Sequence, residues 1–200
     1  MFSFKGFQTQ DKNTHLEHLE DDIINRGAKG GENAINFLKS VRNMLAGSSG
    51  GVNMTVKWDG APAIICGVNP ENGKFFVGTK SVFNKTPKIN YTTSDIRKNH
   101  DGEVAKKLQV CLANLSRLNI KGILQGDLLF TDDLKAINID GEKMISFTPN
   151  TITYAVPVNS DIGKRIARAK MGIVFHTSYS GKTMDKLSAS FGTVRGSSNS

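Results

Sequence analysis

The sequence predicts an α+β fold built on antiparallel strands, and three observations support this class. Short apolar segments typical of strands recur along the chain. Asn72-Gly73, between two of these segments, is a typical hairpin turn. Segments with helical periodicity precede and interrupt the strands rather than alternating with them regularly. The predicted strands are 53–58, 63–68, 74–79, 122–130, 143–147, 151–158 and 172–179.

The predicted helices rest on apolar residues that recur three or four positions apart. The first begins at a capping box, Thr14 to Glu17, and ends at Gly27. Segment 85–101 is polar, and we expect a loop there. The remaining predicted helices are 32–46, 103–118 and a short basic helix over 161–170.

The chain has 200 residues, 38% of them hydrophobic, which is enough to bury one core. We predict that residues 1–50 form a helical segment packed on a main domain of residues 51–191, followed by a loose tail at 192–200. No segment has the length of a signal peptide or a membrane span, so we expect a cytoplasmic protein with no membrane partner. Cys66 and Cys111 lie in apolar stretches and are interpreted as buried hydrophobic residues in a reducing compartment.

The formal net charge of +8 favours an anionic partner, such as a nucleotide, RNA or DNA. The alternative is a solubilising surface without a specific partner. Between Lys74 and Lys107, basic residues are interleaved with aromatic residues, which is the composition of a nucleic-acid groove. A hairpin that buries its aromatic residues while its lysines are solvated would have the same composition.

Lys57 is the candidate catalytic residue. In a strand, Lys57 and Asp59 face the same way and Trp58 faces the other. Gly60 allows a sharp turn or the close approach of a ligand to the backbone. A lysine becomes a nucleophile only after losing its proton, which desolvation, a nearby cation or a metal promotes.

Lys57-Trp58-Asp59-Gly60 resembles the K-x-D-G motif of the covalent nucleotidyltransferases, which include ATP-dependent DNA ligases, RNA ligases and capping enzymes. In that superfamily, the lysine attacks the α-phosphate of a nucleotide and carries the NMP as a phosphoramidate. Three further segments resemble family motifs in the same order: 78–81 with Lys80, 123–130 with Asp127 in place of the usual glutamate, and 151–156 with Tyr154. The resemblance covers about residues 53–158.

The resemblance implies an antiparallel-sheet nucleotidyltransferase domain, of the ATP-grasp-like ligase adenylation type, over residues 51–191. It implies an RNA-ligase-like enzyme that uses ATP with Mg²⁺ or Mn²⁺ and acts on nucleic-acid ends. Lys57, Lys80, Asp127 and Tyr154 should surround one cleft. The implied roles are Lys57 as nucleophile, Asp59 and Gly60 in nucleotide binding, Lys80 on phosphate, Asp127 on ribose or metal, and Tyr154 stacked on the base.

Two late motifs of the superfamily do not match. Met171 stands where a second metal-binding acid is expected, and no K-x-K strand follows. We therefore expect that the chain is part of a longer protein or that its site is incomplete. The alternative function is a catalytically degenerate protein that binds nucleotide or nucleic acid or has a structural role. The whole sequence also resembles an uncharacterised family of large tailed phages.

Other candidate site residues have simpler interpretations. His15 and His18 are three apart on a predicted helix with acidic neighbours, which is typical of a solvated face. His176 lies in an apolar strand and is predicted to be a core histidine whose polar atoms are satisfied. The glycine- and serine-rich segment 47–51 lacks a P-loop lysine pattern and is predicted to be a linker.

Overall fold

The computed structural model describes residues 19–47 and 58–191. The chain divides into two compact units, Met1–Val56 and Lys57–Ser200. The predicted division after residue 50 stays a prediction. The predicted packing of the N-terminal segment on the main domain stays a prediction, and the predicted loose tail at 192–200 lies outside the described residues.

Two helices make up the described part of the first unit, α1 (Leu19–Arg26) and α2 (Ala28–Leu45). They meet at Gly27, whose φ of 56° suits glycine, and this confirms the predicted end of the first helix. The predicted capping box at 14–17 lies outside the described residues. Ala34 is buried, whereas Leu38 and Leu45 on the predicted apolar face are 56% and 72% exposed.

The second unit is organised around a five-stranded antiparallel sheet in the order β2-β1-β3-β7-β8. The turn between β1 and β2 contains Asn72-Gly73, as predicted, and the amide of Gly73 donates to the carbonyl of Asn69 at 2.8 Å. The last strand, β8, was not predicted. The bounds are β1 (Ala63–Val68), β2 (Phe75–Gly78), β3 (Ile123–Phe130), β7 (Gly172–Ser180) and β8 (Ser188–Phe191).

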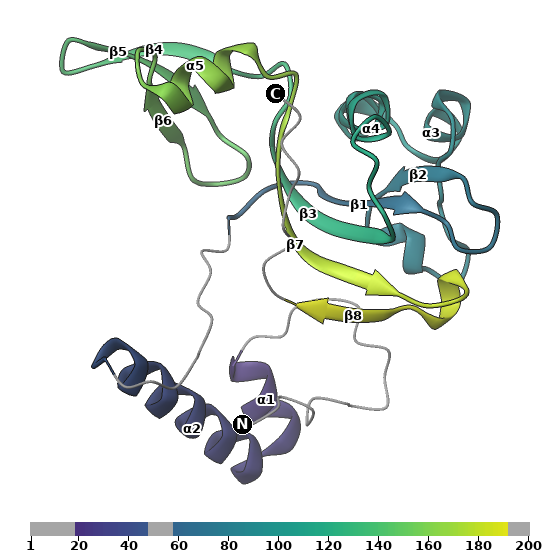
Figure 1. The fold of residues 1–200 in the computed structure, drawn as a ribbon, viewed down its shortest axis with the longest axis vertical. Helices are drawn as coiled ribbons and strands as arrows, with labels where there is room; N and C mark the ends of the chain where they lie inside the picture. Colours follow the sequence, from purple (N-terminus) through teal and green to yellow (C-terminus); the bar gives the residue numbers. More distant parts are fainter. Residues whose placement is uncertain (1–18, 48–57, 192–200) are drawn as a thin grey trace. The chain divides into compact units, whose positions relative to one another are not determined.

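The helices α3 (Thr93–Asn99) and α4 (Gly102–Leu115) cover one face of this sheet (Figure 1). The loop predicted over 85–101 is therefore wrong for its second half. Thr92 and Asp95 form a capping box that starts α3. The core on this face contains Ile64, Cys66, Val77, Ile96, Leu108, Cys111, Leu115 and Leu128.

The opposite face of the sheet carries a second core with short 3₁₀ segments at its edge. These segments are η1 (Lys80–Phe83) and η2 (Met184–Lys186). Apolar strand residues alternate between the two faces, because successive side chains of a strand point to opposite sides. The second core contains Ile65, Phe76, Val82, Ile123, Tyr179 and Met184.

A smaller antiparallel sheet in the order β4-β5-β6 is joined to the first through β3 and β7 and carries helix α5 (Figure 1). Its core contains Phe130, Ile145, Phe147 and Ile166. The first strand, β4, was not predicted. Together the two antiparallel sheets and the helices confirm the predicted α+β class. The bounds are β4 (Lys135–Ile139), β5 (Glu142–Phe147), β6 (Tyr154–Pro157) and α5 (Asp161–Arg168).

Candidate functional site

Lys57 and most of the predicted strand 53–58 lie outside the described residues. The structure begins again at Trp58, and residues 58–60 have no strand assignment, so Trp58 does not end a strand as predicted. The position of the candidate site is therefore defined by the residues that follow the lysine.

Residues 58–62 form hydrogen bonds with both the main sheet and the loop before β6 of the small sheet. The amide of Ala61 donates to the carbonyl of Pro149 at 3.2 Å, next to the small sheet. The carbonyl of Pro62 accepts from the amide of Leu128 in β3 at 3.4 Å. The segment is thus held on one side by β3 and on the other by the loop that precedes β6.

Gly60 lies directly against Asp127 in β3. A Cβ atom at Gly60 would be 2.5 Å from the Leu128 carbonyl oxygen and 2.8 Å from the Asp127 Cβ atom. These distances are shorter than real Cβ contacts, so only glycine fits there without movement. The last residue of the K-x-D-G segment is therefore in close contact with the carboxylate-bearing residue of β3.

The other two described residues of the segment contact the start of the small sheet. The Asn150 Nδ2 atom donates to Asp59 Oδ2 at 2.8 Å. The ring centroids of Trp58 and Tyr154 are 4.9 Å apart and tilted by 46°. Tyr154 also stacks on Phe147, with centroids 5.5 Å apart and an interplanar angle of 24°. Tyr154 lies beside the K-x-D-G segment, but two aromatic neighbours already contact its ring.

Asp127 is 6% exposed and belongs to the face of the sheet opposite α4. It pairs with Ala63 in β1 and with Val174 in β7. Gln125, two residues earlier, shares this face and accepts a 2.6 Å hydrogen bond from the Tyr179 hydroxyl. Burial raises the pKa of that hydroxyl to about 12, so it stays protonated and continues to donate.

Lys80 lies at the same end of the sheet as Asp127. Ile65 pairs with Gly78, so a continuation of β2 in this register would place Lys80 opposite Ala63, the partner of Asp127. At this point the chain turns into η1, where Thr79 Oγ1 accepts a hydrogen bond from the amide of Ser81. Lys80 is exposed, as a phosphate contact requires.

His176 is a polar residue of this site that the sequence interpretation did not include. The ladder between β3 and β7 is shifted between Gln125 and Gly126, which pair with Thr177 and Phe175. His176 is the extra residue of this β-bulge. Its Nε2 atom lies 3.6 Å from Asp127 Oδ1 and is buried without a hydrogen-bond partner among the described residues. The predicted satisfied core histidine is therefore wrong for this atom.

The two cysteines are confirmed as buried free thiols. Burial raises the pKa of Cys111 to about 12. The pKa of Cys66 is raised as well, mainly by burial and to a smaller extent by the nearby Cys111. Both belong to the core under α4, on the face away from Asp127. They are not candidate nucleophiles.

The basic and aromatic segment 74–107 buries part of its aromatic surface. Phe76 is completely buried, and Phe83 packs on Tyr179 with ring centroids 5.1 Å apart. Several lysines here have protein partners: Lys88 donates to the Asn99 carbonyl at 3.0 Å, and Lys107 lies 3.6 Å from Asp133. The segment therefore offers few aromatic faces for stacked bases.

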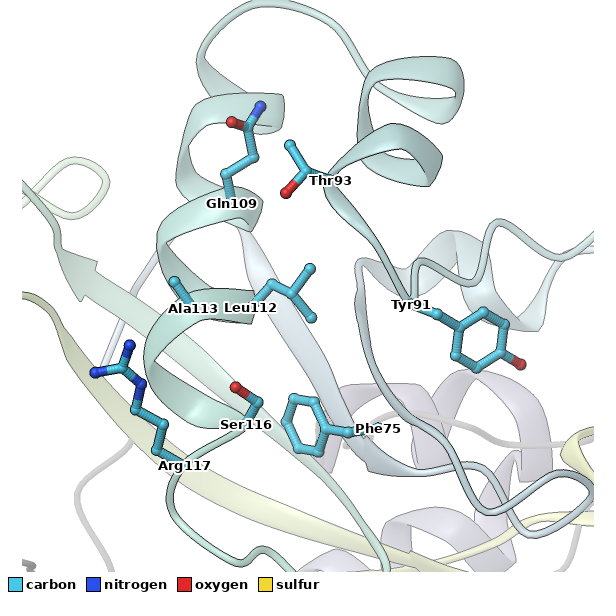
Figure 2. A pocket seen from close by; sticks show the side chains of 8 residues that line it. All are labelled: Phe75, Tyr91, Thr93, Gln109, Leu112, Ala113, Ser116 and Arg117. Carbon is cyan, nitrogen blue, oxygen red and sulfur yellow. The ribbon is translucent and has the colours of Figure 1, made fainter.

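A surface hollow of about 410 Å³ lies elsewhere, between α4, the start of α3 and β2. Phe75 in its wall pairs with Val68, at the opposite end of β1 from Ala63. Figure 2 shows Phe75, Leu112 and Ser116 gathered at one end, with Gln109 and Thr93 at the other. The hollow has no carboxylate, imidazole or amine in its lining, which consists of Phe75, Tyr91, Thr93, Gln109, Leu112, Ala113, Ser116 and Arg117.

Among the residues that the structure describes, no three His, Cys, Asp or Glu side chains gather as metal ligands, and no helix could cross a membrane. No curated protein and no solved structure matches the chain. One family matches it over residues 13–200, nearly its whole length. The chain therefore belongs to this family, which is described as a family of unknown function (DUF6267).

Proposed function

We propose that this chain is an RNA-ligase-like nucleotidyltransferase that forms a lysyl-AMP intermediate on Lys57 from ATP and acts on nucleic-acid ends. The contact between Gly60 and Asp127 carries the proposal. It joins two segments that resemble family motifs and are far apart in sequence. The contact between Trp58 and Tyr154 adds a third such segment.

The proposed chemistry needs a phosphate-binding site beside Lys57. The neutral lysine amine attacks the α-phosphorus of ATP, an N–P bond forms, and the P–O bond to pyrophosphate breaks. The amine proton goes to solvent or to a nearby base. A bound divalent metal would neutralise the phosphate charge. Asp127 provides a carboxylate for the metal or the ribose, and exposed Lys80 provides a cation at the same end of the sheet.

A binding protein without covalent chemistry is the second candidate. Asp59 is already held by Asn150, and Tyr154 already stacks on Phe147. Side chains with protein partners can stabilise a shared fold without taking part in a reaction. This reading retains nucleotide or nucleic-acid binding, or a structural role.

Intact-mass measurement after incubation with ATP and Mg²⁺ or Mn²⁺ separates the two candidates. The enzyme should gain the mass of one AMP group, in a link that survives base and breaks in acid. Lys57→Ala should abolish the adduct, and so should Lys57→Arg, because a guanidinium keeps its charge. Lys74→Ala is the matched control, since Lys74 is an exposed lysine beyond the other end of β1.

Two outcomes would contradict the proposed enzyme activity. Equal labelling of wild type and Lys57→Ala would show that Lys57 is not the nucleophile. No labelling of the wild type with either ATP or GTP would leave the binding protein as the better description. Asp127→Ala should weaken labelling without removing it, because the attacking amine is still present.

A further inference from the structure

We propose that His176 and Asp127 together bind a divalent transition-metal ion, with Mn²⁺ preferred over Mg²⁺. The proposal deepens the proposed function, and rests on it insofar as nucleotidyl transfer gives a reason for a metal beside the nucleotide. The observation is the pair itself: Nε2 of His176 and Oδ1 of Asp127 face each other at 3.6 Å.

The distance is longer than a direct hydrogen bond and close to the spacing of two ligand atoms on one cation. A strong N–H···O bond to a carboxylate spans about 2.7–2.9 Å. Ligand atoms about 2.1 Å from a metal lie about 3.0 Å apart at adjacent octahedral positions and about 3.4 Å apart in a tetrahedron. Small side-chain rotations that shorten the Nε2–Oδ1 distance by about 0.2–0.6 Å would reach these spacings. Among the residues that the structure describes, the buried Nε2 atom has no hydrogen-bond partner.

The other ring nitrogen of His176 is placed as in a metal ligand. Nδ1 lies 2.8 Å from the hydroxyl oxygen of Thr177, which is completely buried. When Nδ1–H donates to this hydroxyl, the lone pair of Nε2 points toward Asp127. A histidine that binds a metal usually donates its second N–H to a fixed acceptor in this way. Thr177 is therefore a positioning residue for His176.

The backbone supports the same assignment. In a regular strand, the neighbour of Thr177 would face away from Gln125 and Asp127, toward the core under α4. The β-bulge between Gln125 and Gly126 leaves His176 unpaired and turns it toward Asp127 instead.

The donor set determines the metal. Oxygen-only sites suit Mg²⁺ and Ca²⁺, whereas an imidazole nitrogen favours first-row transition metals. Two protein ligands leave the remaining positions to water and to the phosphate oxygens of a nucleotide, as is usual where a metal binds with its substrate.

Mn²⁺ binding to the whole chain without nucleotide, followed by electron paramagnetic resonance, tests the proposal. The wild type should bind one Mn²⁺ at this site, with Mg²⁺ competing at least tenfold less effectively. His176→Gln and Asp127→Asn should each weaken Mn²⁺ binding at least tenfold, and Thr177→Val by about 10–100-fold. His100→Gln should bind as wild type, since His100 lies beside Asn90 rather than Asp127.

Wild-type protein that does not bind Mn²⁺, or His176→Gln protein that binds it as the wild type does, overturns the proposal. Circular dichroism confirms that each variant is folded. If the glutamine variant does not fold, Asp127→Asn tests the site from the other ligand. Mn²⁺ binding that depends on both residues, without a lysyl-AMP adduct, supports this site and contradicts the proposed function. A lysyl-AMP adduct together with Mn²⁺ binding that does not depend on His176 supports the proposed function and contradicts this metal site.

Discussion

Replacing Gly60 with alanine tests the contact between the K-x-D-G segment and β3. The new Cβ atom would lie 2.5 Å from the Leu128 carbonyl oxygen, so β3 or the segment must move by several tenths of an ångström. Overpacking of this kind costs about 1–3 kcal/mol of unfolding free energy. A loss of 1 kcal/mol lowers Tm by about 2–4 °C in a chain of this size, so we expect a decrease of roughly 2–12 °C.

Tryptophan fluorescence during thermal and urea unfolding measures this effect, because Trp58 is the sole tryptophan and lies two residues from the change. Gly31→Ala is the matched control. Nothing lies within 4 Å of a Cβ atom there, and alanine is favoured over glycine inside a helix by up to about 1 kcal/mol. A Gly60→Ala protein with the wild-type Tm and urea midpoint would refute the close contact with Asp127, and with it the main support for the proposed function.

Four further predictions concern other parts of the molecule. Neither Cys66 nor Cys111 should react with a thiol reagent at pH 8 until denaturant is added, because both are buried with raised pKa values; one fast-reacting thiol would contradict this. Burial raises the pKa of Cys111 from 9.0 to about 12, so the stability that its thiol contributes is complete below pH 9 and falls as pH rises. Cys111→Ala should make the decrease of the urea midpoint between pH 8 and 10.5 less steep, while Cys66 keeps part of it. Thr92→Ala removes the cap of α3 and should lower the unfolding free energy by about 0.5–2 kcal/mol, measured by urea unfolding. Affinity for single-stranded nucleic acid, measured by fluorescence anisotropy, should fall with salt with a log–log slope of about −0.7 per neutralised phosphate, and no binding at low salt would remove this partner.

The elements that were predicted are those whose own residues are clearly apolar or periodic. The strands 63–68 and 172–179 and the helix 103–118 contribute apolar residues to the cores, and the structure has β1, β7 and α4 there. Helix α3 was missed because its segment is polar, although Thr92 and Asp95 have the spacing of a capping box. A single apolar residue, Ile96, anchors it in the core.

Strand β4 was missed for a different reason. Its residues are largely exposed on both faces, so no alternation of apolar and polar side chains marks it. The turn signal was present, since Asp140-Gly141 follows it and both residues have positive φ, 51° and 85°. Pairing with β5, which has its own apolar pattern, then defines the strand.

The grouping of the candidate site could be predicted in part. The order of the family-like segments predicted that Lys57, Lys80, Asp127 and Tyr154 surround one cleft. That cleft stays a prediction, although Gly60 and Trp58, from the same segment as Lys57, contact Asp127 and Tyr154. The sequence could not predict how the neighbours compete for these side chains. Phe147 comes from β5 and stacks on Tyr154 only because the register pairs these two residues across the small sheet.

His176 shows what a periodic reading of a strand cannot detect. Counting alternate residues in β7 places His176 on the opposite face from Thr177, in the core under α4, where a satisfied histidine is the reasonable expectation. The direction of the His176 side chain instead depends on one extra residue in β7 relative to β3. The residue of β3 at this point is Gly126, which has no side chain. A Cβ atom at Gly126 would be 2.6 Å from the Val174 carbonyl oxygen, so a larger residue at this position would push β3 and β7 apart beside the bulge. Gly126→Ala should therefore move His176 relative to Asp127 and weaken Mn²⁺ binding without changing either ligand. Full Mn²⁺ affinity in a folded Gly126→Ala protein would show that the bulge does not position His176.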